Sequence, residues 1–64
     1  MNINPKNLTP TAQLIIEVYQ EAGYDAAYIH NKADRLRGMT ERQVFSFALT
    51  SLDSTNLEKL KYKL

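Results

Sequence analysis

The residues ADRLRGMTERQV, at positions 33–44, predict two helices joined by a turn. Gly38 stands in the middle of this stretch, where a glycine can take the left-handed backbone conformation that ends a helix. Thr40 and Gln43 have the spacing of a capping box, in which two polar side chains bond the free amide groups of a helix start. The stretch therefore predicts one helix that ends just before Gly38 and another that begins just after Thr40.

Similar signals occur on both sides of this stretch. Thr9 followed by Pro10 is typical of a helix start, with a hydroxyl cap and proline at the first helical position. Gly23 is placed to end that helix, and Asp25 to cap the next one. Thr55 and the glutamate three residues later have the spacing of another capping box. The expected elements are an extended leader at 1–8 and helices at about 10–22, 26–37, 41–52 and 55–63.

The composition is that of one small folded domain over residues 1–64, with 44% hydrophobic residues and no strand pattern. We expect an all-α fold, a compact three-helix bundle with a short fourth helix at the C-terminus. A domain of this size buries only about 60% of its unfolded surface. Because the chain has no cysteine, neither a disulfide nor a cysteine zinc site can stabilise it.

The chain carries no sign of a membrane segment. No apolar run approaches the roughly 18–20 residues of a membrane span. The first residues, MNINP, also lack the apolar core of a signal peptide. We therefore expect a cytoplasmic protein with no membrane partner.

Two of the expected helices, at 10–22 and 41–52, have unusually wide apolar faces. At 100° per residue each apolar arc spans about 200°, whereas a surface helix of a monomer usually needs about 100°. Either both helices lie at the centre of the fold, or another chain covers one flank. In both cases we expect Phe47 to be a core residue. The second interpretation predicts a homodimer or a protein partner. Its predicted interface residues are Phe45, Leu49, Ile16 and Tyr19.

The stretch 33–44 also fits a helix-turn-helix motif, in which the second helix lies in the major groove of DNA. The residues predicted to contact DNA are Arg42, Gln43, Ser46 and Thr50 on that helix, with Lys32, Arg35 and Arg37 before it. Arginine reads guanine and glutamine reads adenine, so the residue types suit base contacts. Two features disfavour this function. The net charge is only +1, and Arg37 occupies a position where the motif usually has an apolar residue.

Catalysis has little support in the sequence. His30 and Asp34 are four residues apart, so one helix face would carry both, and a carboxylate can orient an imidazole in this way. The pair offers two metal ligands where a site needs three or four. No cysteine nucleophile or glycine-rich phosphate loop accompanies it. We therefore predict a surface pair, with no enzyme activity, cofactor, metal or small-molecule substrate.

These observations favour a small non-enzymatic accessory or regulatory protein that acts through an apolar helix face. Self-association as a homodimer is expected, because a partner subunit would also stabilise so small a domain. The alternative is a helix-turn-helix regulator that binds DNA, with 41–52 as its recognition helix.

Overall fold

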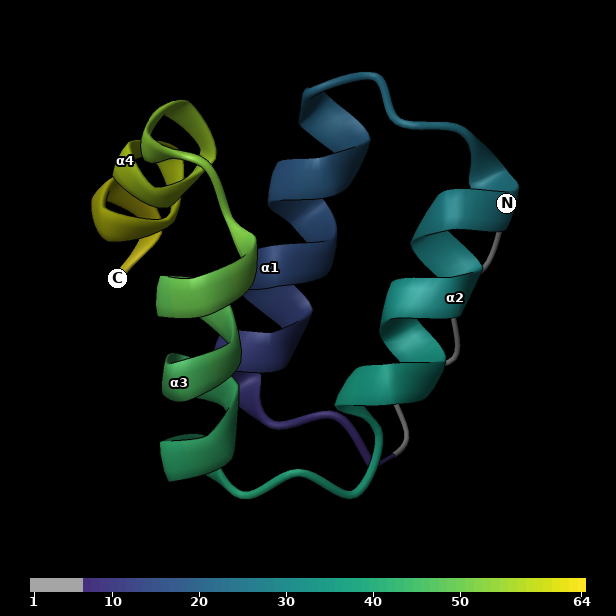
Figure 1. The fold of residues 1–64 in the computed structure, drawn as a ribbon, viewed down its shortest axis with the longest axis vertical. Coiled ribbons are helices and arrows are strands. Elements are labelled where there is room, and N and C mark those ends of the chain that lie inside the picture. The colour runs from purple at the N-terminus through teal and green to yellow at the C-terminus, as the bar shows by residue number, and fades with distance from the viewer. Residues whose placement is uncertain (1–6) are drawn as a thin grey trace.

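The structure, a computed structural model, describes residues 7–64. The described chain forms four helices and no strand, so the all-α expectation is confirmed (Figure 1). The helices are α1 (Pro10–Glu21), α2 (Ala26–Leu36), α3 (Glu41–Ser51) and α4 (Ser54–Lys63). Each end lies within one residue of its expected position. No helix within 7–64 has the length and apolar character needed to cross a membrane.

The turn between α2 and α3 has the predicted local structure. Gly38 takes a left-handed conformation, with φ of +80°. The amide of Thr40 donates to Gln43 Oε1 at 2.9 Å, and the amide of Gln43 donates to Thr40 Oγ1 at 3.2 Å, which completes the capping box. The caps predicted at Thr9 and Asp25 are present as well.

The start of α4 differs from the prediction. Asp53, and not Thr55, is the N-cap, and its carboxylate accepts a hydrogen bond from the amide of Asn56 at 2.8 Å. An aspartate is the stronger cap, because its negative charge also interacts with the positive end of the helix dipole. The Asn56 side chain is buried in this arrangement, and its Nδ2 donates to the Tyr24 hydroxyl at 3.2 Å.

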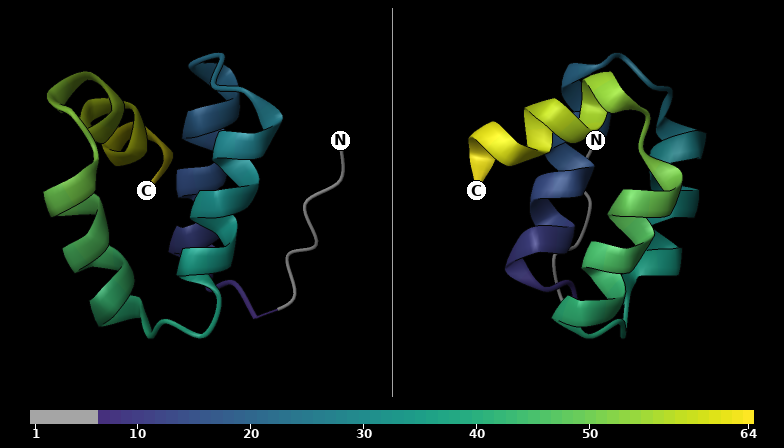
Figure 2. Two further views of the ribbon diagram at one scale, coloured as in Figure 1. Left: turned by 45° about the vertical axis from the view of Figure 1, so that its right-hand side comes forward. Right: turned by 60° about the vertical axis from the view of Figure 1, so that its left-hand side comes forward.

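The core is built around α1, which packs against α2, α3 and α4 (Figures 1 and 2). The leader residue Leu8 is buried too, and the carbonyl of Asn7 accepts a hydrogen bond from Gly38 at 3.2 Å. The rest of the expected leader, residues 1–6, lies outside the described residues. The buried hydrophobic residues are Leu8, Ala12, Ile15, Ile16, Val18, Tyr19, Ile29, Ala33, Leu36, Val44, Ala48, Leu52 and Leu60.

Phe47 is not the fully buried core residue that was expected. It is half-buried and packs against the margin of the core. The reason is the position of α3, which packs mainly on α1 and therefore buries only a narrow stripe, Val44 and Ala48.

Polar contacts attach α3 and α4 to α1. Thr11 Oγ1 donates to the Glu41 carboxylate at 2.7 Å, and hydrogen bonds from threonine hydroxyls hold the pKa of Glu41 below its usual value. Lys63 Nζ lies 2.7 Å from Glu21 Oε2 and 3.5 Å from Glu17 Oε1. The hydrogen bond to Glu21 raises the pKa of Lys63. These bonds orient the two outer helices on the same central one.

Candidate functional site

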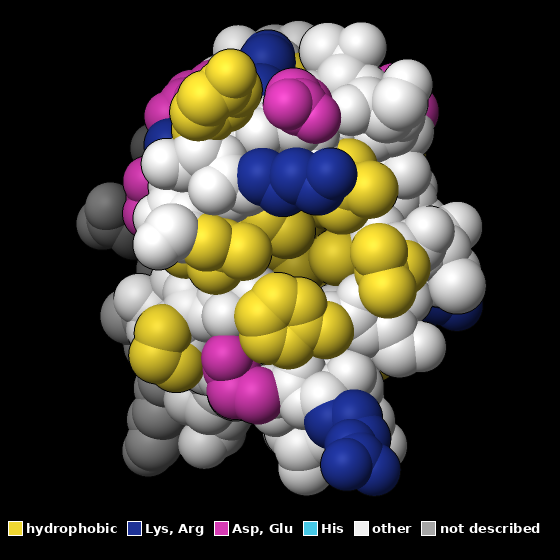
Figure 3. Space-filling view, turned by 90° about the vertical axis from the view of Figure 1, so that its left-hand side faces the viewer, with side chains coloured by type: hydrophobic (Ala, Val, Ile, Leu, Met, Phe, Trp, Pro, Cys, Tyr) yellow, Lys and Arg dark blue, Asp and Glu magenta, His cyan; other side chains and the backbone are white. Residues whose placement is uncertain are grey.

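An apolar hollow of about 220 Å³ lies between α3 and α4, and we refer to it as the α3–α4 groove. Its lining residues are Phe45, Ala48, Leu49, Leu57, Leu60, Lys61 and Leu64. Figure 3 shows hydrophobic side chains gathered at the centre of this face of the molecule, with charged side chains around them. Lys61 is the one charged residue that the described chain contributes to the lining.

The groove has a buried floor and exposed walls. Ala48 and Leu60 form the floor and are almost fully buried. Leu49 is 68% exposed, Leu64 is 63% exposed and Phe45 is 42% exposed. The walls stay open because α3 and α4 each pack mainly on α1, so neither covers the flank of the other. The result is a contiguous apolar surface that water contacts.

The predicted protein interface is partly at this groove. Phe45 and Leu49 both line it and are exposed. The prediction for Ile16 and Tyr19 was wrong, because they are only 4% and 1% exposed. Both belong to α1, which other helices surround, so their side chains are covered within the chain itself.

The sequence interpretation missed the contribution of α4 to this surface. Leu57, Leu60 and Leu64 line the second wall and the floor. Their spacing already places them on one helix stripe. Helical spacing does not predict which of these leucines stay exposed beside Phe45 and Leu49. Their exposure depends on how α4 packs on α1.

The residues predicted to read DNA bases lie on the outer polar stripe of α3. All four of these side chains are exposed: Arg42, Gln43, Ser46 and Thr50. Two of them already make local hydrogen bonds. The Gln43 amide is part of the capping box, and Thr50 Oγ1 donates to the Ser46 carbonyl at 3.0 Å. A shallow hollow of about 310 Å³ lies along this stripe, lined by Met39, Gln43, Ser46, Phe47 and Thr50.

The predicted phosphate contacts lie on and just after α2. Lys32 Nζ sits 5.0 Å from the centre of the Tyr28 ring, Arg37 is hydrogen bonded to Asp34, and Arg35 is exposed. In a helix-turn-helix the two helices cross at roughly 90–120°. Here α2 and α3 run in opposite directions, and both pack on α1 (Figures 1 and 2). This arrangement differs from the helix-turn-helix crossing, and DNA binding stays a prediction.

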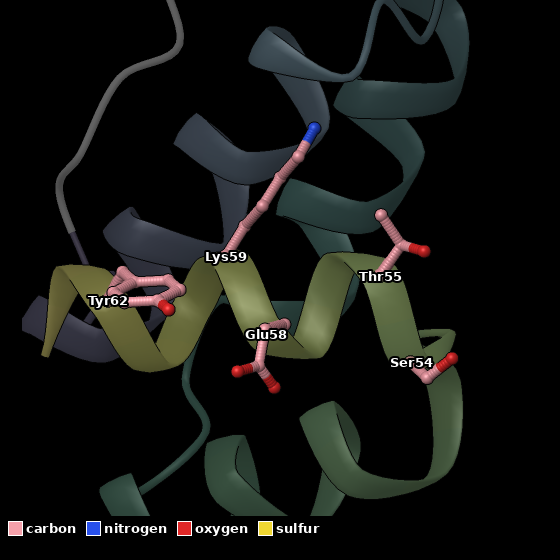
Figure 4. Close-up of a pocket in the computed structure, with 5 residues that line it drawn as sticks. All are labelled: Ser54, Thr55, Glu58, Lys59 and Tyr62. Carbon is pink, nitrogen blue, oxygen red and sulfur yellow. The ribbon is translucent and has the colours of Figure 1, made fainter.

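A second opening, of about 430 Å³, lies on the outer side of α4 and is shown in Figure 4. Ser54, Thr55, Glu58, Lys59 and Tyr62 line it, and all of them come from this one helix. Glu58 and Lys59 point to opposite sides of α4, so these two ionisable groups do not converge on a common point. The opening is a shallow surface feature in which no acid is paired with a base.

The described residues 7–64 contain no group of three or more histidine, aspartate or glutamate side chains that could hold a metal ion. His30 is exposed on α2. Asp34, the expected neighbour of His30, forms a salt bridge with Arg37.

Three tyrosines pack together where α1, α2 and the connection between them meet. The ring centres of Tyr19, Tyr24 and Tyr28 are 4.8 to 5.6 Å apart. The buried Tyr19 hydroxyl has no hydrogen-bond partner among the described residues. Burial raises the pKa of Tyr19 to about 12, because the charged phenolate is poorly solvated there. The rings contact each other directly, so the cluster is a structural contact between helices.

Comparison with known protein families, with curated proteins and with solved structures finds no match to this chain.

Proposed function

We propose that this chain is a small non-enzymatic accessory or regulatory protein that binds a protein surface through the α3–α4 groove. One observation supports the proposal. Phe45, Leu49 and Leu64 expose large apolar side chains side by side over a buried apolar floor. Contiguous apolar patches on small soluble proteins mark interaction sites more often than isolated apolar residues do.

The shape of the groove suits a particular kind of partner. Two helices with an apolar hollow between them accept an apolar helix surface of a partner chain. Covering this area removes apolar surface from water, which contributes about 25 cal/mol per Å². Lys61 at the edge of the groove, 66% exposed, can interact with a carboxylate of the partner while its aliphatic stem stays on the apolar surface.

Site-specific photo-crosslinking tests this proposal. A photoreactive phenylalanine analogue is placed at Leu49 in cells that express the chain naturally. A matched variant carries the analogue at Ala27, which is exposed on α2 away from the groove. After irradiation, the products are separated by mass and identified.

We expect a defined crosslinked protein product with the probe at position 49 and none with the probe at 27. Either this chain or another protein can be the crosslinked species. The same weak smear of products from both positions, with no defined band at 49, would show that the groove is not an interaction site.

A further inference from the structure

We propose that the partner in the α3–α4 groove is a second copy of this chain, in a two-fold symmetric dimer. This inference rests on the proposed function of the groove. In such a dimer the same surface is used twice, so its charges must complement themselves after a two-fold rotation. The charged side chains around the groove have this property.

Opposite edges of the apolar surface carry charges in opposite order. In Figure 3 the upper edge has a basic side chain next to the apolar centre and an acidic one further out. The lower edge has an acidic side chain next to the centre and a basic one further out. Consider a two-fold axis that lies in the plane of the interface and runs midway between these two edges. Rotation about this axis places the upper edge of one copy against the lower edge of the other copy. Unlike charges then face each other.

The residues at these edges follow from the helices that form the groove. On the α4 side, Lys61 lines the groove, and its Nζ lies 4.0 Å from Oε2 of the neighbouring Glu58. On the α3 side, Glu41 and Arg42 are exposed in the first turn, one helical turn before Phe45. The dimer therefore pairs Lys61 with Glu41 of the other copy, and Glu58 with Arg42 of the other copy. Each pair occurs twice, once on either side of the axis.

The size of the chain supports a dimer of modest affinity. A standard stable interface takes about 800 Å² from each partner, about one fifth of the 4142 Å² that this chain exposes. The proposed interface uses only the facing sides of α3 and α4 and the first turn of α3, so we expect it to be no larger than this. We therefore expect a dissociation constant in the micromolar range. Association would also stabilise a 64-residue domain that has no disulfide.

The first experiment is sedimentation equilibrium of the purified full chain between about 1 and 500 µM, a range that brackets micromolar dissociation. We expect the wild type to shift from monomer to dimer over this range. Leu49→Glu places a charge on the apolar wall and should raise the dissociation constant by more than about tenfold. The control, Ala27→Glu, adds the same charge to α2 and should leave the dissociation constant unchanged. Circular dichroism of each variant shows whether it is folded.

A second experiment tests the two-fold arrangement by exchanging charges. Arg42→Glu and Glu58→Lys both change exposed positions. Each variant alone puts like charges opposite each other twice, so each homodimer should weaken by roughly threefold to tenfold. When the two variants are mixed, the carboxylate introduced in one chain faces the ammonium introduced in the other, and the second Arg42 and Glu58 pair is unchanged. The equimolar mixture should therefore dimerise better than either variant alone.

Three results would overturn this proposal. One is a wild type that stays monomeric at about 500 µM, far above a micromolar dissociation constant. Another is a Leu49→Glu variant that dimerises as tightly as the wild type. The third is a mixture of the charge variants that dimerises no better than its components, which would exclude the two-fold pairing.

The same measurements separate this proposal from the proposed function of the groove. A monomeric wild type together with a defined crosslink from position 49 to a different protein would exclude the dimer and leave the proposed function standing. A monomer without such a crosslink would exclude both.

Discussion

The helices α1 and α3 have apolar arcs of similar width in the sequence, yet they bury very different shares of them. In α1 the buried residues include Ile15, Val18 and Tyr19, and the arc is covered almost completely. In α3 only Val44 and Ala48 are buried. The difference lies in their neighbours, because three helices surround α1 while α3 packs mainly on α1 alone. The width of an apolar arc shows how much a helix can bury, and its place in the fold decides how much it does bury.

The largest effect should come from a cavity in α1. Ile15 is fully buried, so Ile15→Ala should lower the free energy of unfolding by about 2–5 kcal/mol, through lost burial and the cavity that remains. Urea unfolding followed by circular dichroism measures this change. Ile15→Val is the matched control and should cost about 0.5–1.5 kcal/mol. Equal stability of the alanine variant and the wild type would mean that α1 is not the centre of the core.

A smaller loss of unfolding free energy is expected at the margin of the core on α3. Phe47 is half-buried, so Phe47→Ala should cost about 2–3 kcal/mol, less than the roughly 3–5 kcal/mol of a fully buried phenylalanine. Phe47→Leu keeps most of the apolar contact and should cost less than the alanine variant. Both are measured at low protein concentration, where association does not contribute. A cost above that of Ile15→Ala would reverse the assigned roles of the two helices.

The burial of Tyr19 on α1 should appear as an alkaline loss of stability. Its pKa in the folded chain is about 12, above the ordinary value of 10, so the folded state holds the proton more tightly. The resulting contribution to the free energy of unfolding is complete below about pH 10. It is lost as the pH rises towards 12, by roughly 2 kcal/mol. Urea unfolding of the wild type and of Tyr19→Phe across this pH range measures it.

Tyr19→Phe should lack this component of the pH dependence. At neutral pH the variant should unfold within about 1 kcal/mol of the wild type, because the hydroxyl that it removes has no hydrogen-bond partner among the described residues. An identical alkaline loss in the variant and the wild type would assign the effect to other groups.

The smallest effect on monomer stability should come from the exposed wall of α3. Leu49 is 68% exposed, so Leu49→Ala should change the free energy of unfolding by less than about 0.5 kcal/mol at about 1 µM protein, where we expect a monomer. The measurement is thermal unfolding at this concentration and at several hundred micromolar. The wild type should gain stability at the higher concentration, and the variant should gain less. A loss of about 2 kcal/mol in the dilute sample would mean that Leu49 is part of the core.

Much of the fold was predictable because its signals are local. The caps at Thr9, Asp25 and Thr40 each join atoms at most three residues apart, and the bend at Gly38 depends on its missing side chain. The error at Thr55 is of the same local kind. Two residues that can cap a helix lie close together there, and Asp53 forms the stronger cap.

The site was predictable only in part. The interpretation in which another chain covers one flank of 41–52 requires Phe45 and Leu49 to be exposed, and both are exposed. Ile16 and Tyr19 are buried instead, because the equally wide apolar face of α1 is covered by the neighbouring helices. The leucines of α4 that complete the groove looked like ordinary packing positions.

By itself, the sequence determined four helices, their bounds and the residues on each apolar stripe, because hydrogen bonds and helical periodicity act over a few neighbouring residues. The tertiary structure alone decided which stripes are covered and which remain open. Burial depends on segments far apart in the chain, such as Leu49 and Leu64, which reach the same groove only because α3 and α4 both pack on α1. The proposed interface is the apolar surface that this packing leaves uncovered.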